Sequence, residues 1–171
     1  MKLNARCDAT AKSVSVAPEL TKLDYTTAIS KKHGIESSAV AYRNLMFAAD
    51  NDGNLICWDA NTLQVIWARD LGDDTDASIV IDKAGYLYVA QEVERTSSRA
   101  RSTEVGQLIK LAPRKPDDPI VWSVADDHGI WATPALSKGV VFAPPDRGRT
   151  VGVSHTTGQL LWEKQLPGRP S

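Results

Sequence analysis

The amino-acid sequence predicts an all-β protein built from copies of one four-stranded unit. Short apolar runs alternate with turn residues such as Asn, Asp and Gly, which is typical of strands joined by hairpins. One arrangement of strands and turns, clearest in residues 48–67, returns along the chain and ends on a tryptophan each time. Self-similarity of this kind indicates a repeat architecture.

The spacing of the repeat is regular in the first and last complete units. In the first unit a strand begins at Leu45, and Gly53, Asp59 and Trp67 follow eight, fourteen and twenty-two residues later. The equivalent residues of the last unit are Val140, Gly148, Ser154 and Trp162. The middle unit ends on Trp122 and contains an inserted polar loop, EVERTSSRARST.

A constant offset of 95 residues relates the first and last units. It pairs His33-Gly34-Ile35 with His128-Gly129-Ile130, and it extends toward the N-terminus, where Thr27 takes the position of Trp122. The start of the chain is therefore predicted to be the last two strands of a unit. A helix over residues 18–32 is the competing interpretation.

The predicted organisation is one half unit, residues 1–30, and three complete units, residues 31–73, 74–127 and 128–171. The first twelve residues are polar and are expected to be a frayed end. The expected strands are residues 14–16, 25–29, 39–42, 45–49, 55–59, 64–69, 78–82, 86–91, 107–111, 120–124, 134–137, 140–143, 150–154 and 160–164.

A four-stranded antiparallel unit of roughly 40 residues cannot bury both of its faces alone. When such units stack radially, each sheet covers its neighbour, which is the arrangement of a β-propeller. The recurring Trp67, Trp122 and Trp162 are expected to be buried between adjacent sheets. The sequence thus predicts a partial β-propeller of about three and a half four-stranded blades.

Composition excludes some classes of function. The net charge of −1 gives no electrostatic reason to bind nucleic acid or an anionic membrane surface, and the basic residues at 95–101 are expected to lie in a solvated loop. No apolar run reaches the roughly 20 residues that span a bilayer, and the first residues lack a secretory signal, so the protein is cytosolic or its signal lies outside this chain. Cys57 is expected to be a small buried hydrophobe, and a disulfide with Cys7 is left open.

Three stretches carry a recognisable consensus. Residues 50–67 read D-x-D-G-N-L-x-x-x-D-A-x-T-x-x-x-x-W, and residues 148–162 read G-x-x-x-x-x-S-x-T-T-G-Q-L-L-W. With W-A-T-P-A-L-S-K-G at residues 131–139, they resemble the repeats of the pyrroloquinoline-quinone-type (quinoprotein alcohol dehydrogenase-like) β-propeller family. That family usually has Gly where Leu63 stands, so the turn at Leu63 is expected to differ.

The resemblance implies one of two kinds of function. Some members are periplasmic dehydrogenases of alcohols or sugars that use pyrroloquinoline quinone with calcium, whereas others keep the propeller without the chemistry, as scaffolds in outer-membrane protein assembly or as sensor domains. In the enzymes a tryptophan forms the floor under the quinone ring, which makes Trp131 the candidate cofactor-binding residue; packing between blades is its alternative role. The enzymes also carry adjacent cysteines, and this sequence has none.

Other candidate sites have simpler interpretations. Residues 50–54 are expected to form a hairpin turn rather than a calcium loop, because the twelfth residue from its start is Asn61 and not Glu. His33, His128 and His155 show no zinc-ligand spacing. Acidic residues of the inter-blade loops could act as acid and base or could simply be solvated. They are Asp73, Asp74, Asp76, Asp126 and Asp127.

We expect a non-catalytic propeller segment that serves as a scaffold, without a cofactor, and binds through its blade-top loops, especially residues 92–104. The alternative is part of a quinone-dependent dehydrogenase, with pyrroloquinoline quinone and calcium as cofactors and Trp131 near the ring. An incomplete arc of blades leaves sheet faces and edges exposed, which favours association. The expected partner is therefore a protein or further propeller blades, including further copies of this chain, and a stable monomer would contradict this expectation. The compartment is left open, with the periplasm implied by the resemblance.

Overall fold

The all-β prediction is confirmed by the computed structural model, which describes residues 3–6, 15–18, 34–93 and 102–168. The only helical segments in these residues are one turn of α-helix, α1 (Ser102–Val105), and one 3-10 turn, η1 (Asp146–Gly148). Three four-stranded antiparallel sheets and one two-stranded sheet make up the strands of the described residues, and in each four-stranded sheet the strands follow one another in chain order. The four-stranded sheets are the blades of a partial propeller.

The expected strands and the observed ones agree closely. The first blade consists of β3 (Val40–Tyr42), β4 (Leu45–Ala49), β5 (Asn54–Asp59) and β6 (Val65–Asp70). The second consists of β7 (Val80–Ile81), β8 (Leu87–Ala90), β9 (Leu108–Leu111) and β10 (Ile120–Val124). The third consists of β11 (Ala135–Ser137), β12 (Val140–Ala143), β13 (Arg149–Ser154) and β14 (Leu160–Gln165).

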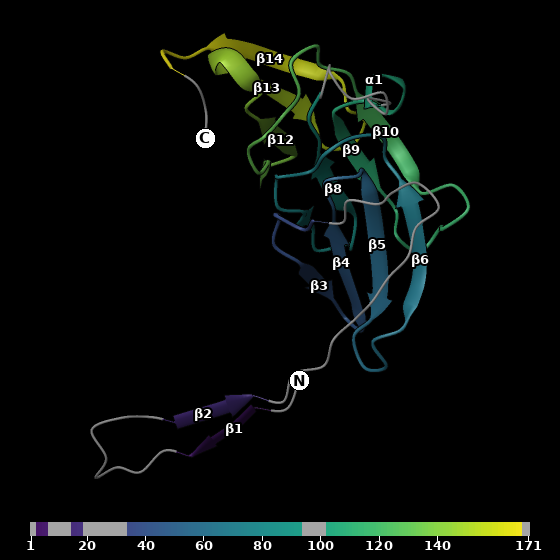
Figure 1. Ribbon diagram of the computed structural model, residues 1–171. Coiled ribbons are helices and arrows are strands. Elements are labelled where there is room, and N and C mark those ends of the chain that lie inside the picture. Colours follow the sequence, from purple (N-terminus) through teal and green to yellow (C-terminus); the bar gives the residue numbers. More distant parts are fainter. Residues whose placement is uncertain (1–2, 7–14, 19–33, 94–101, 169–171) are drawn as a thin grey trace.

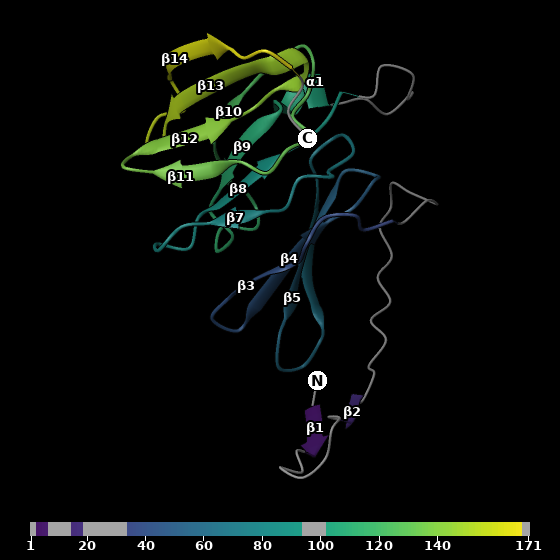
Figure 2. The ribbon, with the colours of Figure 1, turned by 90° about the vertical axis from the view of Figure 1, so that its left-hand side faces the viewer.

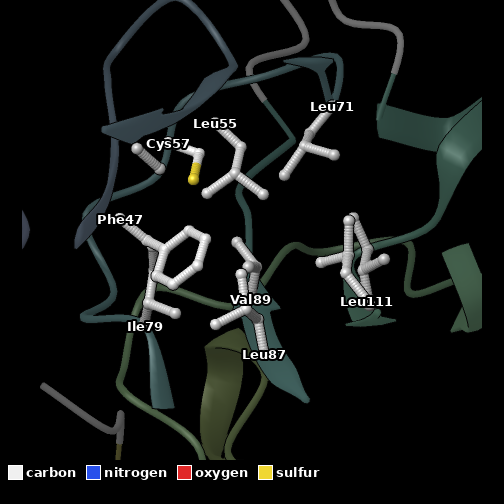
Figure 3. Close-up of a cluster of buried hydrophobic side chains, with 10 residues drawn as sticks. Phe47, Leu55, Cys57, Leu71, Ile79, Leu87, Val89 and Leu111 are labelled. Carbon is white, nitrogen blue, oxygen red and sulfur yellow. The ribbon is translucent and has the colours of Figure 1, made fainter. Parts of the chain in front are cut away.

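The second blade lies between the first and the third, and the three sheets fan out from one side of the molecule (Figures 1 and 2). The first and second blades enclose one apolar core, to which Phe47, Leu55, Leu87, Val89 and Leu111 each contribute a fully buried side chain (Figure 3). Burial of apolar side chains from both sheets stabilises this joint, at about 25 cal/mol for each Å² of apolar surface removed from water.

A second core joins the second and third blades. It contains Tyr88 and Trp122 from the second blade and Val141, Val151 and Val153 from the third. Alternate residues of β12 and β13 enter this core because successive side chains of a strand point to opposite faces of the sheet. The remaining alternate residues therefore point away from the second blade.

The N-terminal segment contains a two-stranded antiparallel sheet in its described residues, and the prediction of a half blade over residues 1–30 stays untested. β1 (Leu3–Arg6) pairs antiparallel with β2 (Ser15–Pro18), so residues 3–6 form a strand within the stretch that was expected to fray. Leu3 and Ala5 alternate with polar residues, which is a strand-like pattern within a segment of polar overall composition. The expected strand at residues 25–29 and the alternative helix at 18–32 lie outside the described residues.

The turn at Leu63 does not differ from its repeat equivalent, and that prediction is wrong. Leu63 has φ of 60° and Gly158 has φ of 73°, so both lie in the left-handed region. Their amides donate to equivalent carbonyl oxygens, those of Asp59 and Ser154, each at 2.8 Å. The Asp59 carboxylate also accepts two backbone amides of the turn, at 2.8 and 2.9 Å. These hydrogen bonds hold Leu63 in a conformation that ordinarily costs about 1–2 kcal/mol for a residue with a side chain.

Candidate functional site

The recurring tryptophans occupy one position in all three blades, beside an aromatic residue of the second strand. The ring centroids lie 6.1 Å apart for Phe47 and Trp67, 6.0 Å for Tyr88 and Trp122, and 5.8 Å for Phe142 and Trp162. Each pair is tilted, a favourable geometry for aromatic rings. The repeat therefore positions the tryptophan within its own blade in the same way three times.

Burial of these tryptophans is unequal. Trp122 is 9% exposed, and Trp67 is partly buried against the first core, as expected for residues between sheets. Trp162 is 42% exposed, so the prediction that it is buried between sheets is wrong. The physical reason is that none of the sheets formed by the described residues packs against its face of the third blade.

Trp122 shows how the next blade covers the ring. Its Nε1 donates to the backbone carbonyl oxygen of His155 in the β13–β14 turn, at 3.1 Å. Gly158 of the same turn lies against the ring, and a Cβ atom placed there would be 2.8 Å from Cδ2 of Trp122. Glycine is required at this position for space as well as for its positive φ.

The uncovered surface of the third blade is built from the same residue positions. Val140, Phe142, Gly152 and Trp162 share one face, because Phe142 pairs with Gly152 and Gly152 pairs with Trp162 across adjacent strands. We call these four residues the open face. Phe142 is only partly buried, whereas its repeat equivalent Phe47 is completely buried under the second blade. All six residues of β14 are exposed.

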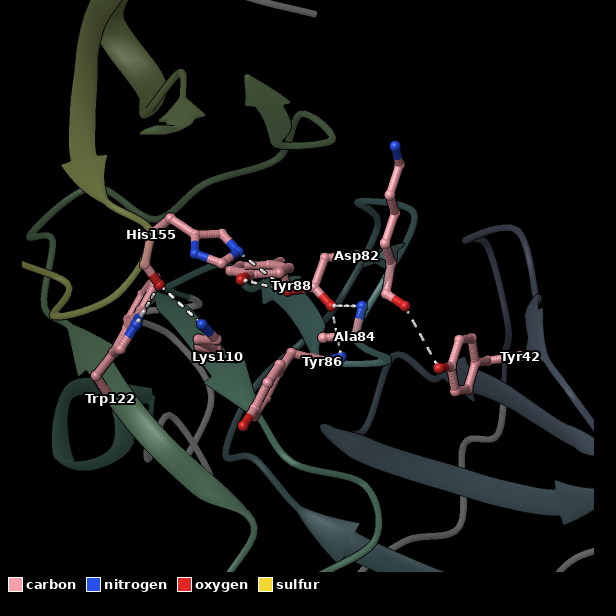
Figure 4. A network of polar contacts seen from close by, with 9 residues as sticks. Tyr42, Asp82, Ala84, Tyr86, Tyr88, Lys110, Trp122 and His155 are labelled. Carbon is pink, nitrogen blue, oxygen red and sulfur yellow. Dashed lines mark hydrogen bonds and ion pairs between the residues drawn. The ribbon is translucent and has the colours of Figure 1, made fainter. Parts of the chain in front are cut away.

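A polar network joins the second and third blades at the edge of their core (Figure 4). The Asp82 carboxylate accepts the backbone amides of Ala84 and Tyr86, both at 2.9 Å. Its other oxygen accepts the hydroxyl of Tyr88 at 3.1 Å and lies 3.0 Å from Nε2 of His155 in the third blade. Burial raises the pKa of Asp82, but these hydrogen bonds outweigh burial and hold it below its usual value.

Lys110 brings a cationic group into the same joint. Its Nζ donates to the carbonyl oxygen of His155 at 2.8 Å and lies 4.4 Å from the centre of the Tyr86 ring. Burial lowers the pKa of Lys110, and the Asp82 charge partly offsets this. Burial and the nearby Asp82 charge raise the pKa of Tyr88. The groups satisfy one another, so the arrangement ties two blades together.

Arg149 makes a second polar contact between the same blades. Its guanidinium donates to both carboxylate oxygens of Glu163, at 2.9 and 3.0 Å, and also contacts the Asp126 carboxylate in the loop after β10. The Glu163 hydrogen bond raises the pKa of Arg149, and the same bond lowers that of Glu163. Asp126 and Asp73 are 7% and 5% exposed, so the solvated-loop interpretation is wrong for these two residues.

Trp131 lies outside both inter-blade cores and is 51% exposed. The residue before it, Ile130, is buried and donates its amide to the Gln91 carbonyl oxygen, which fixes the start of the third blade. The interpretation of Trp131 as an inter-blade packing residue is therefore wrong. Its role under a cofactor ring stays a prediction.

The residues first considered as calcium or cysteine sites have structural roles in the described part of the chain. No group of three His, Cys, Asp or Glu side chains among the described residues is arranged to hold a metal ion. Cys57 is a buried free thiol on β5, and burial raises its pKa to about 11. Asp50 is fully buried and closes the predicted hairpin turn by accepting the amides of Asp52 and Asn54.

The histidines and the expected contact loop are only partly described. His128 donates its amide to Asp126 at 2.9 Å and His155 contacts Asp82, whereas His33 lies outside the described residues. Glu92, at the start of the predicted contact loop, is 8% exposed, and residues 94–101 also lie outside them.

The family model described as outer membrane protein assembly factor BamB matches residues 13–171. The chain belongs to this family. The resemblance to pyrroloquinoline-quinone-type propeller repeats is thereby confirmed. No curated protein sequence matches this member of the BamB family.

Solved structures show the same fold at low sequence identity. BamB from Moraxella catarrhalis is 16% identical with a TM-score of 0.60, over 80% of this chain and 38% of that one. Quinohemoprotein alcohol dehydrogenase from Comamonas testosteroni is 19% identical with a TM-score of 0.57, over 77% of this chain and 21% of that one. The computationally designed Ika8 protein is 17% identical with a TM-score of 0.60, over 76% of this chain and 36% of that one. The chain thus spans less than two fifths of the BamB structure.

Proposed function

We propose that this chain is a non-catalytic propeller segment that serves as a protein-binding scaffold. The observation that carries this proposal is the open face, where Phe142 and Trp162 are preassembled as in the covered blades but remain accessible. Exposed aromatic residues on a preformed surface are typical anchors of protein interfaces. A likeness to a family described by its role in outer-membrane protein assembly supports the same function.

The partner in this proposal is a protein or a further propeller blade, in the periplasm. The family description supports this compartment, since outer-membrane protein assembly takes place there. No helix in the described part of the chain has the length and apolar character needed to cross a membrane. Further copies of this chain are one of the outcomes that the experiments below distinguish.

Site-specific photo-crosslinking tests the proposed function. A photoreactive amino acid replaces Trp162 in the full chain, and a second variant carries it at Trp131, which is similarly exposed but lies off the open face. We expect position 162 to cross-link a protein that position 131 does not. That protein, once purified, is expected to bind the wild-type chain at least tenfold more tightly than Trp162→Ser.

Two results would contradict the scaffold. One is cross-linking that is equally efficient from both positions. The other is a purified partner whose affinity is the same for the wild type and for Trp162→Ser. Circular dichroism and the urea midpoint of each variant establish that the blades remain folded, so that loss of binding reports on the surface itself.

A quinone-dependent dehydrogenase is the second candidate, and the exposure of Trp131 favours it, because an accessible indole face can stack on a planar ring. Adding pyrroloquinoline quinone with Ca²⁺ to the full chain tests this candidate. Saturable, stoichiometric binding that Trp131→Ala abolishes would support it. Absence of saturable binding would exclude a quinone site formed by these residues alone.

A further inference from the structure

A cavity lies between the second and third blades, beside their shared core. Its volume is about 210 Å³, and its wall is mainly apolar. Leu108 and Val124 line it from the second blade. Ile130, Val151 and Val153 line it from the side of the third blade. Because Val151 and Val153 point toward the second blade, the cavity and the open face lie on opposite faces of the third sheet.

The smaller side chains of the third blade account for this cavity. By repeat position, Val151 is equivalent to Ile109 of the second blade. Val153 is likewise equivalent to Leu111, and both residues of the second blade are fully buried in its core with the first. Each valine is one carbon smaller than its equivalent. Removing volume from a packed core leaves a void wherever the surroundings do not close in, so the second joint has space that the first joint fills.

The mouth of the cavity is charged where the first joint is apolar. Asp126 stands four residues after the tryptophan of its unit, where the first unit has the fully buried core residue Leu71. Asp126 and Arg149 line both the cavity and an adjoining hollow of about 270 Å³. Asp127 and His128 complete the wall of this hollow. The apolar cavity therefore continues into a polar mouth.

The charges at this mouth favour a cation over an anion. The Arg149 guanidinium donates to both carboxylate oxygens of Glu163 and contacts the Asp126 carboxylate. Two carboxylates thus already surround the one guanidinium, and Asp127 adds a third to the wall of the hollow. An incoming anion would meet these carboxylates, whereas an incoming cation is attracted by them.

We propose that the cavity binds an organic ammonium ion, with its apolar part between the two blades and its positive charge at the mouth. An apolar cavity of roughly 150 Å³ is large enough to bind benzene, so this cavity accommodates a phenyl ring or a branched aliphatic group. The site goes beyond the proposed scaffold function, because it uses neither Phe142 nor Trp162 of the open face.

Three probes of the same shape test the charge preference on the full chain. 2-Phenylethylammonium, 2-phenylethanol and 3-phenylpropionate share a phenyl ring on a two-carbon chain and differ in the group that reaches the mouth. Isothermal titration calorimetry is expected to show saturable one-to-one binding of the ammonium ion. We expect at least threefold weaker binding of the alcohol and at least tenfold weaker binding of the carboxylate. Absence of saturable ammonium binding, or equal affinity for the carboxylate, would overturn the proposal.

Filling the cavity tests its location. The double variant Val151→Ile, Val153→Leu introduces the side chains of the first joint and is expected to weaken ammonium binding at least tenfold. Val80→Ile is the matched control, since Val80 packs against the same core but does not line the cavity. This control is expected to bind within twofold of the wild type. Equal affinities in all three proteins would place the ligand elsewhere and contradict the inference.

Nuclear Overhauser contacts locate the probe without any variant, which keeps the test decisive if the filled variant does not fold. In the methyl-labelled wild-type chain, the ring protons of 2-phenylethylammonium are expected to contact the methyl groups of Ile130, Val151 and Val153. Contacts confined to methyl groups outside the cavity would overturn the assignment.

Trp162→Ser separates this site from the scaffold. The variant removes the main aromatic group of the open face, and we expect it to bind 2-phenylethylammonium within twofold of the wild type. Loss of binding would place the probe on the open face and overturn the inference, with the scaffold function left standing. Conversely, cavity binding in a chain whose photo-crosslinking experiment fails would support the ammonium site and remove the scaffold function.

Discussion

Trp122 and Trp162 occupy the same place in neighbouring blades and have opposite surroundings. Each lies about 6 Å from an aromatic residue of its own blade, yet one is 9% exposed and the other 42%. The difference comes from the turn of the third blade, which covers the Trp122 ring, whereas no turn among the described residues covers the Trp162 ring. Each blade thus determines the orientation of its own tryptophan, whereas the adjacent blade determines how deeply that tryptophan is buried.

Replacing each of the two tryptophans by alanine is expected to give the largest difference in stability between the two blades. Trp122→Ala is expected to lower the free energy of unfolding by about 3–5 kcal/mol, because it empties a packed site between two blades. Trp162→Ala is expected to lower it by less than about 1 kcal/mol, since much of that ring is already in water. Urea denaturation measures both values. Equal losses would contradict the unequal burial on which the comparison depends.

Exchanging the residues at the equivalent positions 63 and 158 is expected to give the next largest change in stability. Gly158→Leu is expected to cost about 2–3 kcal/mol, because the side chain strains the backbone and collides with the Trp122 ring. Leu63→Gly is expected to change stability by less than about 1 kcal/mol, since relief of strain is offset by the greater freedom of glycine in the unfolded chain. Thermal unfolding of both variants checks this. A similar cost for both exchanges would show that the ring contact is unimportant.

Acid sensitivity of the joint between the second and third blades depends on Asp82. The pKa of Asp82 is lowered in the folded state, so its contribution to stability is complete above its ordinary value of 3.8. That contribution is lost as the pH falls through the lowered pKa. Asp82→Asn is expected to lose about 1–2 kcal/mol at pH 6, where His155, Lys110 and Tyr88 still surround the site.

Urea midpoints from pH 6 down to pH 3 measure this effect. We expect the Asp82→Asn variant to lose less stability over this range than the wild type, because one carboxylate that must be protonated has been removed. Parallel curves for the two proteins would show that Asp82 does not support the joint.

The smallest expected effect concerns Arg149. Arg149→Lys is expected to cost less than about 1 kcal/mol, since the ion pair is partly solvated, but to remove the two parallel hydrogen bonds to Glu163. Added salt should narrow the difference between wild type and variant, because screening weakens partly exposed pairs. A difference that grows with salt concentration would exclude this account of the contact.

Features that depend on residues close together in the chain, such as strand positions and turns, could be predicted from the sequence. Strand positions followed from the alternation of apolar residues and from glycine at corners, and β4, β10 and β12 begin and end where expected. The turn at Leu63 was misjudged because residue preference is a weaker influence than the hydrogen bonds that Asp59 makes to that turn.

Contacts between blades could not be predicted from the sequence. His155 and Asp82 are separated by 73 residues, and no spacing rule connects them. The exposure of Trp162 and the burial of Asp126 also depend on which sheet lies alongside, a property of packing. By contrast, the three aromatic pairs were visible in principle, because an aromatic residue stands two positions into the second strand of every unit: Phe47, Tyr88 and Phe142.

The solvent accessibility of the indole groups tests the central claim most directly. In the wild-type chain labelled with ¹⁵N-tryptophan, each indole N–H signal is assigned by single substitution and then exposed to a soluble paramagnetic agent. We predict strong broadening for Trp162 and Trp131, and protection of Trp122 by the turn of the third blade. Equal broadening of the Trp122 and Trp162 signals would contradict the account, because the two indole groups would then be equally exposed to solvent.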